Sequence, residues 1–265
     1  MIKIIATDMD GTLLGSNHKI SKLNQNTLQK AQANGIHLIL ASGRPLHGLV
    51  HQVEVMGLST ENTSLLAFNG AIIIDAKTHE IHISDTLKLD LTKRLINHLK
   101  KYNVDIMLTD DKILYSLKND EIAKHEAHSN DLEVVQTNYE EVNFRPHKIL
   151  VSAEATYLDS IIDEIKAPFK GEADFVKSAP FYLECLIINE NKGKTLARFC
   201  EMLNVDLKDV IAFGDNYNDM ELIQTAGIGV AMGNAVEPLK KIADIIAETN
   251  DNDGLAKVLI EKGIV

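Results

Sequence analysis

The chain has 265 residues, of which 45% are hydrophobic, so it can bury one large core or two moderate ones. Its formal net charge of -11 argues against a nonspecific nucleic-acid or membrane surface, and no apolar stretch is long enough for a signal peptide or a membrane span. We therefore expect a soluble, cytoplasmic protein without a nucleic-acid or membrane partner, while the oligomeric state stays open. Cys185 and Cys200 lie in apolar segments and are expected to be buried free thiols.

The first predicted strand, residues 4–6, leads into the acidic stretch Asp8-Met9-Asp10-Gly11. A loop at the end of a buried strand can turn both carboxylates toward one metal ion and one phosphoryl group. The glycine lets the backbone come close to that phosphate. Aspartate and glycine are also common turn residues, so this stretch alone leaves an ordinary turn equally open.

A helix is predicted next, over residues 21–34. Ser21 is its expected N-cap, Leu23 and Leu28 lie on its expected apolar face, and Gly35 ends it.

A second strand and helix follow at once. The apolar strand predicted over 36–41 delivers Ser42, Gly43 and Arg44 at its carboxyl end. Successive strand–helix units imply an α/β fold with a doubly wound, Rossmann-like parallel sheet, in which ligands gather beyond the carboxyl ends of the strands. Asp8 and Ser42 should therefore lie on the same edge of the sheet.

The middle of the chain has a different pattern. Short strands and tight turns appear after residue 64, and helix-like and strand-like segments then alternate in a way that favours a smaller α/β domain with an antiparallel sheet. We predict a core formed by residues 1–84 and 188–265, interrupted by an inserted domain over 85–187. His125 and His128 are interpreted as a solvated helix face, because no further metal ligand is visibly arranged with them.

The strand–helix rhythm returns in the last third. The elements expected there are a helix opened by Lys192 with Cys200 and Leu203 on its apolar face, strands over 210–213 and 229–232, and a helix over 254–262. The strand over 210–213 delivers Asp215, Asn218 and Asp219.

Four places in the chain bear groups that phosphoryl transfer needs. They are the stretch at Asp8 and Asp10, the stretch at Ser42 and Arg44, Lys192, and the stretch at Asp215 and Asp219. Aspartate carboxylates hold a hard cation such as Mg²⁺, while a lysine, a hydroxyl and backbone N–H groups neutralise phosphate oxygens. Asp215 and Asp219 alone would be expected to cap a helix, and Lys192 alone would be expected to be solvated. An EF-hand and a P-loop are both excluded, because their glycines do not stand at the required positions.

Together the four motifs resemble those of the haloacid dehalogenase-like (HAD) phosphohydrolases, specifically the Cof-type, type IIB subfamily. The motifs are Asp8-Met9-Asp10-Gly11-Thr12-Leu13, Ser42-Gly43-Arg44, Lys192-Gly193 and Gly214-Asp215-x-x-Asn218-Asp219. Further similarity lies in Asn69-Gly70-Ala71, Leu183-Glu184 and Val230-Ala231-Met232-Gly233-Asn234-Ala235, so the resemblance covers the core and, more loosely, the insertion. Two departures, Ser42 where threonine is also common and Cys185 at a usual isoleucine position, remove no functional group.

The resemblance implies a Mg²⁺-dependent phosphatase for a small phosphorylated metabolite, such as a sugar phosphate or a phosphorylated cofactor. It makes Asp8 the nucleophile that forms an aspartyl-phosphate, and Asp10 the general acid and then the general base. The implied metal ligands are Asp8, Asp10 through its backbone carbonyl, Asp215 and, in the outer shell, Asp219. The implied phosphate and substrate contacts are the amides of Met9 and Gly43, together with Ser42, Lys192, Asn218 and Arg44, which orients the substrate or braces the loop.

The inserted domain is then expected to be a cap that closes over the core edge. Candidate substrate-selecting residues in it are Tyr182, Glu184 and the segment Arg145-Pro146-His147. Two alternatives stay open: a phosphomutase of the same family, and a non-catalytic module that binds a metabolite and regulates. A transport ATPase is excluded by the lack of membrane helices.

Overall fold

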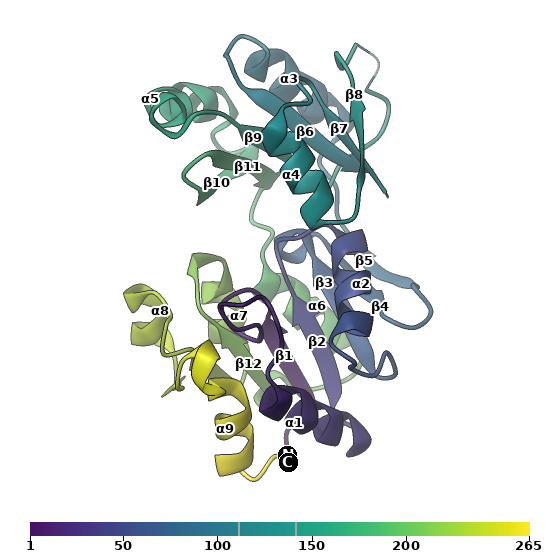
Figure 1. Ribbon diagram of the computed structural model, residues 1–265, viewed down its shortest axis with the longest axis vertical. Coiled ribbons are helices and arrows are strands. Elements are labelled where there is room, and N and C mark those ends of the chain that lie inside the picture. Colours follow the sequence, from purple (N-terminus) through teal and green to yellow (C-terminus); the bar gives the residue numbers. More distant parts are fainter. Residues whose placement is uncertain (111, 141) are drawn as a thin grey trace. The chain divides into compact units, whose positions relative to one another are not determined.

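The computed structural model describes residues 1–110, 112–140 and 142–265 and divides the chain into two compact units (Figure 1). The core unit comprises Met1–Ser84 and Asn191–Val265, and the inserted unit comprises Asp85–Glu190. Each unit has its own sheet. Of the helices in the described ranges, none is both long and apolar enough to cross a bilayer.

The core unit is built on one sheet. Its strands are β1 (Ile4–Asp8), β2 (His37–Ala41), β3 (Thr63–Ala67), β4 (Ile72–Asp75), β5 (Ile81–Ser84), β12 (Val210–Gly214), β13 (Ile228–Ala231) and β14 (Ile245–Ile246). They lie in the order β14-β13-β12-β1-β2-β3-β4-β5. All neighbours pair in parallel from β14 to β3, whereas β4 and β5 are antiparallel. The predicted α/β fold with a parallel, doubly wound core is confirmed.

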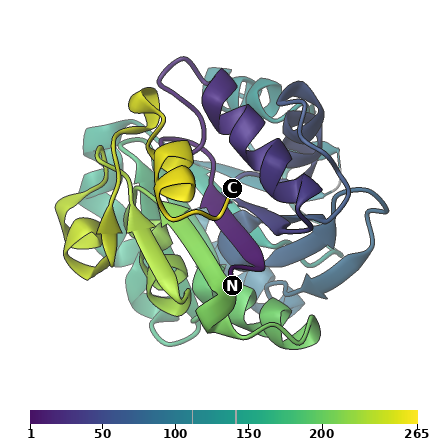
Figure 2. The ribbon, with the colours of Figure 1, turned by 90° about the horizontal axis from the view of Figure 1, so that it is seen from below.

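Helices cover both faces of this sheet. They are α1 (Lys22–Ala33), α2 (Leu46–Val55), α6 (Lys192–Met202), α7 (Met220–Thr225), α8 (Glu237–Ile242) and α9 (Gly254–Glu261). Figure 2 shows α1 and α9 on one side of the strands and α6, in green, on the other. The sequence patterns gave no sign of the short elements α7, α8 and β14, because six residues or fewer hold too little periodicity.

The helix α1 begins as predicted and buries Leu28 on its predicted apolar face. The Ser21 side chain accepts a hydrogen bond from the Asn24 N–H, and Gly35 follows the helix with a φ of +81°. Leu23 is wrong as a core residue, since it is 39% exposed. Asn24 is buried instead, and its Oδ1 accepts a hydrogen bond from the Ala256 N–H at 3.1 Å, which joins α1 to α9.

The helix α6 packs its apolar face on the opposite side of the sheet. Asn191 caps it by accepting a hydrogen bond from the Lys194 N–H at 2.8 Å, and Phe199 and Cys200 are buried in the core beneath the strands. Leu203 is wrong as a core residue: it lies at the end of α6 and is 40% exposed. Cys200 and Cys185 are both buried free thiols, as predicted.

The inserted unit holds a second sheet. Its strands are β6 (Asp105–Asp110), β7 (Ile113–Ser116), β8 (Glu133–Gln136), β9 (Lys148–Ser152), β10 (Ala173–Ala179) and β11 (Tyr182–Ile187), in the order β10-β11-β9-β6-β7-β8. The neighbours are antiparallel except β7 and β8. The helices are α3 (Leu89–Leu99), α4 (Glu121–Ser129) and α5 (Ala155–Lys166). The strands β8 and β10 could not be predicted, because they are largely exposed and lack the apolar alternation of a buried strand.

Alternation along the strands of this unit explains its two layers of packing. Ile106 and Ile149 face a core that includes α3 and α5, whereas Met107 and Leu150 face a smaller core that includes α4.

Candidate active site

The site begins with three neighbouring strands of the core unit. β1 lies between β2 and β12, all three are parallel, and Asp8 pairs in register with Ala41. Parallel strands end at the same edge of a sheet, so Asp8, Ser42 and Asp215 come to one edge, as the sequence predicts.

Lys192, the first residue of α6, lies in the centre of a buried ionic cluster. Its Nζ is 2.5 Å from Asp8 Oδ1 and 2.6 Å from Asp219 Oδ1. The side chains of Lys192 and Asp219 are fully buried, and that of Asp8 is 9% exposed. The cluster joins residues that are 184 positions apart in the sequence. Lys192 is therefore not the solvated lysine that it would be expected to be by itself.

Asp219 uses its two carboxylate oxygens for different purposes. Oδ1 binds Lys192, while Oδ2 accepts hydrogen bonds from the backbone N–H groups of Asp215 and Asn216 at 3.0 and 3.1 Å. It thus caps the turn after β12 and at the same time holds the buried lysine.

Asp215 is held by the loop that follows β1. Its Oδ1 accepts a hydrogen bond from the Thr12 hydroxyl at 2.8 Å. Gly11 has a φ of +82°, and a Cβ there would lie 2.5 Å from Asp215 Oδ2. Only glycine fits this position, because both the backbone conformation and the close approach exclude a side chain.

Burial governs the electrostatics of the cluster. Burial raises the pKa of Asp8 well above its ordinary value, and the Asp219 charge adds to this effect while Lys192 opposes it. Burial also raises the pKa of Asp215 to about 6. Burial by itself would lower the pKa of Lys192, but the charges of Asp219 and Asp8 outweigh it and raise this pKa. Three carboxylates thus face one ammonium group, and the excess negative charge is stabilised by a proton or a cation.

The same three carboxylates can hold a metal ion. Oxygen atoms of Asp8, Asp215 and Asp219 all lie within 4.8 Å of one another. A donor set made only of oxygen suits a hard divalent cation such as Mg²⁺. His125 and His128 are exposed on α4 and do not belong to this group, which is the one such cluster among the residues that the structure describes.

Asp10 is paired with Arg44. The arginine Nε donates to Asp10 Oδ2 and Nη2 donates to Asp10 Oδ1, both at 2.8 Å. His18 Nδ1 lies 3.9 Å from the same carboxylate. The Asp10 side chain is 40% exposed, in contrast with the buried Asp8. Arg44 therefore braces the loop that carries both aspartates.

The remaining predicted phosphate contacts lie in the loops at this edge. Ser42 is 3% exposed, and its Oγ accepts a hydrogen bond from the Arg44 N–H at 3.1 Å. Asn218 donates from its Nδ2 to Asn69 Oδ1 at 2.9 Å. The Met9 side chain is fully buried, and its carbonyl accepts a hydrogen bond from the Leu14 N–H at 2.9 Å, which closes the loop.

The chain resembles known proteins over nearly its whole length. A family model described as haloacid dehalogenase-like hydrolase matches residues 5–259. The chain belongs to this family. The prediction of a HAD hydrolase is confirmed.

Individual relatives share nearly the whole length. The 5-amino-6-(5-phospho-D-ribitylamino)uracil phosphatase YcsE of Bacillus subtilis is 31% identical, over 97% of this chain and 94% of its own. The crystal structure of a haloacid dehalogenase-like hydrolase from Bacteroides thetaiotaomicron is 32% identical with a TM-score of 0.91, and the match covers 99% of this chain and 100% of that one. A HAD subclass IIB sugar phosphatase, BT4131, shares the fold with a TM-score of 0.83 at 22% identity, over 99% of this chain and 100% of its own. This chain thus has the same fold as that subclass IIB member.

Two asparagines near the C-terminal end of the chain, for which no role was predicted, hold the loop that follows β1. Asn234 Nδ2 donates to the Gly11 carbonyl at 2.8 Å, and Asn250 Nδ2 donates to the Leu14 carbonyl at 2.9 Å. The Asn250 N–H also donates to Asn234 Oδ1 at 3.0 Å. The one available signal was the similarity of residues 230–235 to the subfamily, since the partners lie 223 and 236 positions apart.

Residues predicted to select the substrate have partners within the inserted unit. Tyr182 donates from its hydroxyl to Glu126 Oε2 at 3.2 Å, and Lys148 Nζ lies 3.0 Å from Glu184 Oε1. His147 Nδ1 lies 2.7 Å from the Asp85 carbonyl. Their role in substrate selection stays a prediction.

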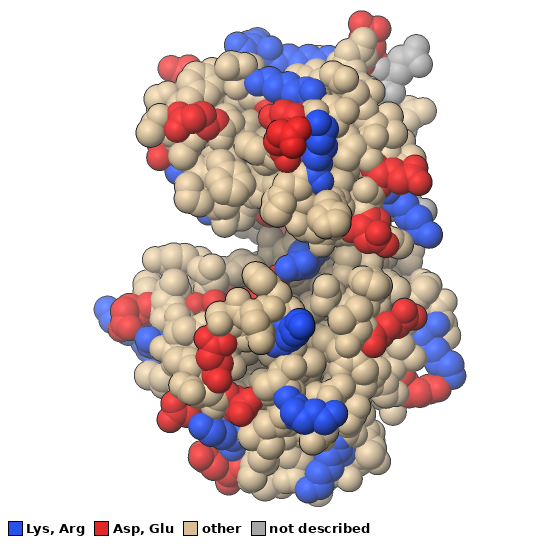
Figure 3. Space-filling view, in the orientation of Figure 1, with Lys and Arg blue, Asp and Glu red and all other residues tan. Residues whose placement is uncertain are grey.

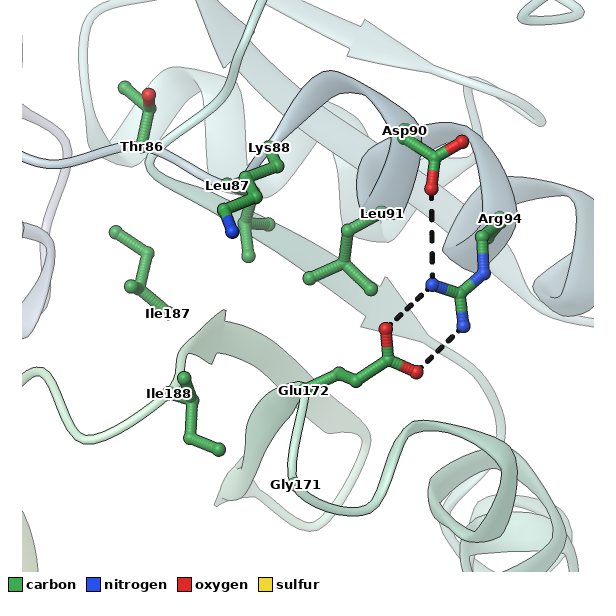
Figure 4. Close-up of a pocket in the computed structure, with 10 residues that line it drawn as sticks. All are labelled: Thr86, Leu87, Lys88, Asp90, Leu91, Arg94, Gly171, Glu172, Ile187 and Ile188. Atoms are coloured by element: carbon green, nitrogen blue, oxygen red, sulfur yellow. Dashed lines mark hydrogen bonds and ion pairs between the residues drawn. The ribbon is translucent and has the colours of Figure 1, made fainter.

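A cavity of about 440 Å³ lies in the inserted unit (Figure 4). Its wall consists of Thr86, Leu87, Lys88, Asp90, Leu91, Arg94, Gly171, Glu172, Ile187 and Ile188. Arg94 forms a bidentate ion pair with Glu172 at 2.6 and 2.7 Å. None of the predicted site residues lines this cavity, so the carboxylate cluster of the core unit is the candidate active site.

Proposed function

We propose that the chain is a Mg²⁺-dependent phosphatase that hydrolyses a small phosphorylated metabolite through an aspartyl-phosphate on Asp8. The buried cluster of Asp8, Lys192, Asp215 and Asp219 carries this proposal. It combines a nucleophile, a fixed positive charge and an all-oxygen cation site at one edge of a sheet. When bound, Mg²⁺ would neutralise charge on the carboxylates and on the phosphate.

In the first step an Asp8 carboxylate oxygen attacks phosphorus and the bond from phosphorus to the leaving oxygen breaks. Asp10 gives its proton to that oxygen, so the alcohol leaves neutral. In the second step Asp10 takes a proton from water, the water oxygen attacks phosphorus, and the bond to Asp8 breaks to give inorganic phosphate. The phosphoryl oxygens are held by the ammonium group of Lys192, the Ser42 hydroxyl and the side-chain amide of Asn218. The backbone N–H groups of Met9 and Gly43 bind them as well.

The ion pair between Asp10 and Arg44 belongs to the resting enzyme in this scheme. An ion pair needs the ionised carboxylate, whereas the first step needs a proton on Asp10. We therefore infer that Arg44 leaves Asp10 when a substrate phosphate or its neighbouring group offers the guanidinium another anion.

The inserted unit is proposed to be the cap that covers the core edge and selects the substrate. The names of the relatives include a phosphatase for a ribitylaminouracil phosphate and a sugar phosphatase. We propose a sugar phosphate or a phosphorylated cofactor as the substrate of this chain.

A panel of phosphorylated metabolites with Mg²⁺, scored by released phosphate, tests the proposal. We expect release from at least one sugar phosphate or phosphorylated cofactor, and loss of release after chelation of the metal. Phosphate release that survives chelation, or none from any compound, would contradict it. An isomeric sugar phosphate formed without free phosphate would instead identify a phosphomutase.

A further inference from the structure

Phe68 and Asn69 follow β3 in an unusual backbone conformation. Their φ angles are +51° and +58°, so two consecutive residues that are not glycine adopt the left-handed region. Asparagine tolerates this region better than most residues, but phenylalanine does not. Such a conformation persists only where the surroundings impose it, and it gathers at functional sites.

The backbone of these two residues holds the loop that follows β2. The Asn69 N–H donates to the Ser42 carbonyl at 3.0 Å, and the Phe68 N–H donates to the Arg44 carbonyl at 3.1 Å. The end of β3 thus fixes the backbone on both sides of Gly43, whose amide is a proposed phosphate ligand.

The Asn69 side chain reaches a second loop of the site. Its Oδ1 accepts a hydrogen bond from Asn218 Nδ2 at 2.9 Å. A Cβ placed on Gly43 would lie 3.1 Å from both amide atoms of Asn69, so the same amide packs directly against Gly43. One side chain therefore contacts both the loop after β2 and the loop after β12.

Gly70 lets the segment 68–70 pack closely against the start of α6, which carries Lys192. A Cβ on Gly70 would lie 2.5 Å from the Asn191 carbonyl oxygen, and the Gly70 carbonyl accepts a hydrogen bond from the Thr195 hydroxyl at 2.6 Å. The segment 68–70 is thereby packed against the start of α6, in addition to the loops after β2 and β12. These contacts fix the position of Asn69.

We propose that Asn69 is a positioning residue for phosphoryl transfer, acting through the Asn218 amide and the Gly43 backbone. The proposal rests on the proposed phosphatase function. Asn69 accepts one N–H of the Asn218 amide, which directs the NH₂ group of Asn218 and leaves its second N–H for a phosphate oxygen. Asn69 needs no contact with the substrate, since its effect is to hold two phosphate donors in the geometry of the transition state.

The variant Asn69→Gly tests this role, because glycine accepts the left-handed backbone while the side chain and its amide are removed. With p-nitrophenyl phosphate and Mg²⁺ we expect kcat to fall about 10- to 100-fold with little change in KM. Asn62→Gly is the matched control. Asn62 also has a left-handed φ, +52°, but it is exposed and precedes β3 at the other end. Its activity should equal that of the wild type, and both variants should keep the wild-type unfolding midpoint.

A double-mutant cycle shows whether Asn69 acts through Asn218. If it does, Asn69→Gly should lower kcat by a clearly smaller factor in a protein that already carries Asn218→Ala than in the wild type, because only its effect on the Gly43 backbone remains. Full additivity of the two losses, or an Asn69→Gly enzyme within about twofold of the wild type, would overturn the positioning role while leaving the phosphatase in place. A wild-type protein without any phosphatase activity would overturn the proposed function itself, and this inference with it.

Discussion

Two ion pairs, one from each unit, differ in their exposure to water. In the core unit Lys192 lies between Asp8 and Asp219 with its side chain out of contact with water. In the inserted unit Arg94 and Glu172 form an ion pair of similar length whose side chains are each 44% exposed. On the face that Figure 3 draws, positive and negative side chains are interspersed.

Burial makes these two ion pairs physically different. Removing charged groups from water costs several kcal/mol for each ion, and the attraction between them only partly offsets it. A surface pair loses little hydration and gains little. A sequence that keeps a buried lysine among three carboxylates therefore bears a cost that stability alone does not require, which is typical of a site kept for its chemistry. Substitutions in the two units should reveal this difference.

The largest effect is expected for Asp8→Asn. The amide has the shape of the carboxylate but cannot attack phosphorus, so Mg²⁺-dependent phosphate release should fall by about 10⁴-fold or more. Asp90→Asn in α3, where the side chain is 87% exposed, is the control and should keep full activity. Equal hydrolysis by the wild type and the Asp8 variant would show that the nucleophile lies elsewhere.

The next effect concerns stability and is expected for Lys192→Met. The substitution leaves the carboxylates of Asp8 and Asp219 buried without their counter-charge, so the free energy of unfolding should fall by about 3–5 kcal/mol near neutral pH. The loss should shrink in acid as these carboxyl groups bind protons. Urea denaturation at several pH values measures both.

Lys208→Met serves as the control for the buried lysine. Lys208 pairs with Asp206, and both side chains are exposed, so its unfolding midpoint should stay close to that of the wild type. If both lysine substitutions were equally harmless, the buried cluster would not depend on its central charge.

A third, smaller effect follows from the pKa of Asp215. Burial raises it from 3.8 to about 6, so between these pH values the folded protein holds a proton that the unfolded chain has lost. Without metal, this residue's contribution to stability is therefore full below about pH 4 and is lost as the pH rises through about 6. The substitution Asp215→Asn removes this pH dependence of stability. The variant should be more stable than the wild type at neutral pH by about 1–2 kcal/mol.

Adding Mg²⁺ should make the wild type more stable than Asp215→Asn. A cation that binds only the folded state at 100 times its Kd stabilises by about 2.7 kcal/mol, and Asp215→Asn lacks one of the carboxylates that would hold it. Thermal unfolding with Mg²⁺ and with a chelator gives the comparison. Parallel pH curves for the wild type and the variant, unaffected by Mg²⁺, would remove Asp215 from the metal site.

The sequence was most informative where long buried strands end in polar residues. The strands that lead to Asp8, Ser42 and Asp215 are apolar except at Thr7 and His37, so both the parallel sheet and the shared edge could be predicted. The errors at Leu23 and Leu203 have one cause. Helical spacing places these residues near the apolar face, but each lies at an end of its helix and is exposed.

Contacts between distant loops could not be predicted. The pairing of Asp10 with Arg44, and of Asn69 with Asn218, depends on how loops at one sheet edge meet, which the spacing of residues does not encode. The sequence places Asn69 in a motif similar to the subfamily, whereas its left-handed backbone appears only in three dimensions.

The smallest effect is expected for the exposed pair of the inserted unit. Arg94→Ala and Glu172→Ala should each leave activity unchanged, and the cycle formed with the double variant should give a coupling of at most about fivefold in the unfolding equilibrium constant. Salt should weaken even that coupling, because water and ions reach both side chains. The same cycle made with Lys192 and Asp219 should give a much larger coupling that salt barely changes, since neither side chain is exposed. Equal couplings for the two pairs would mean that burial does not distinguish them, and the buried cluster would then not indicate a catalytic site.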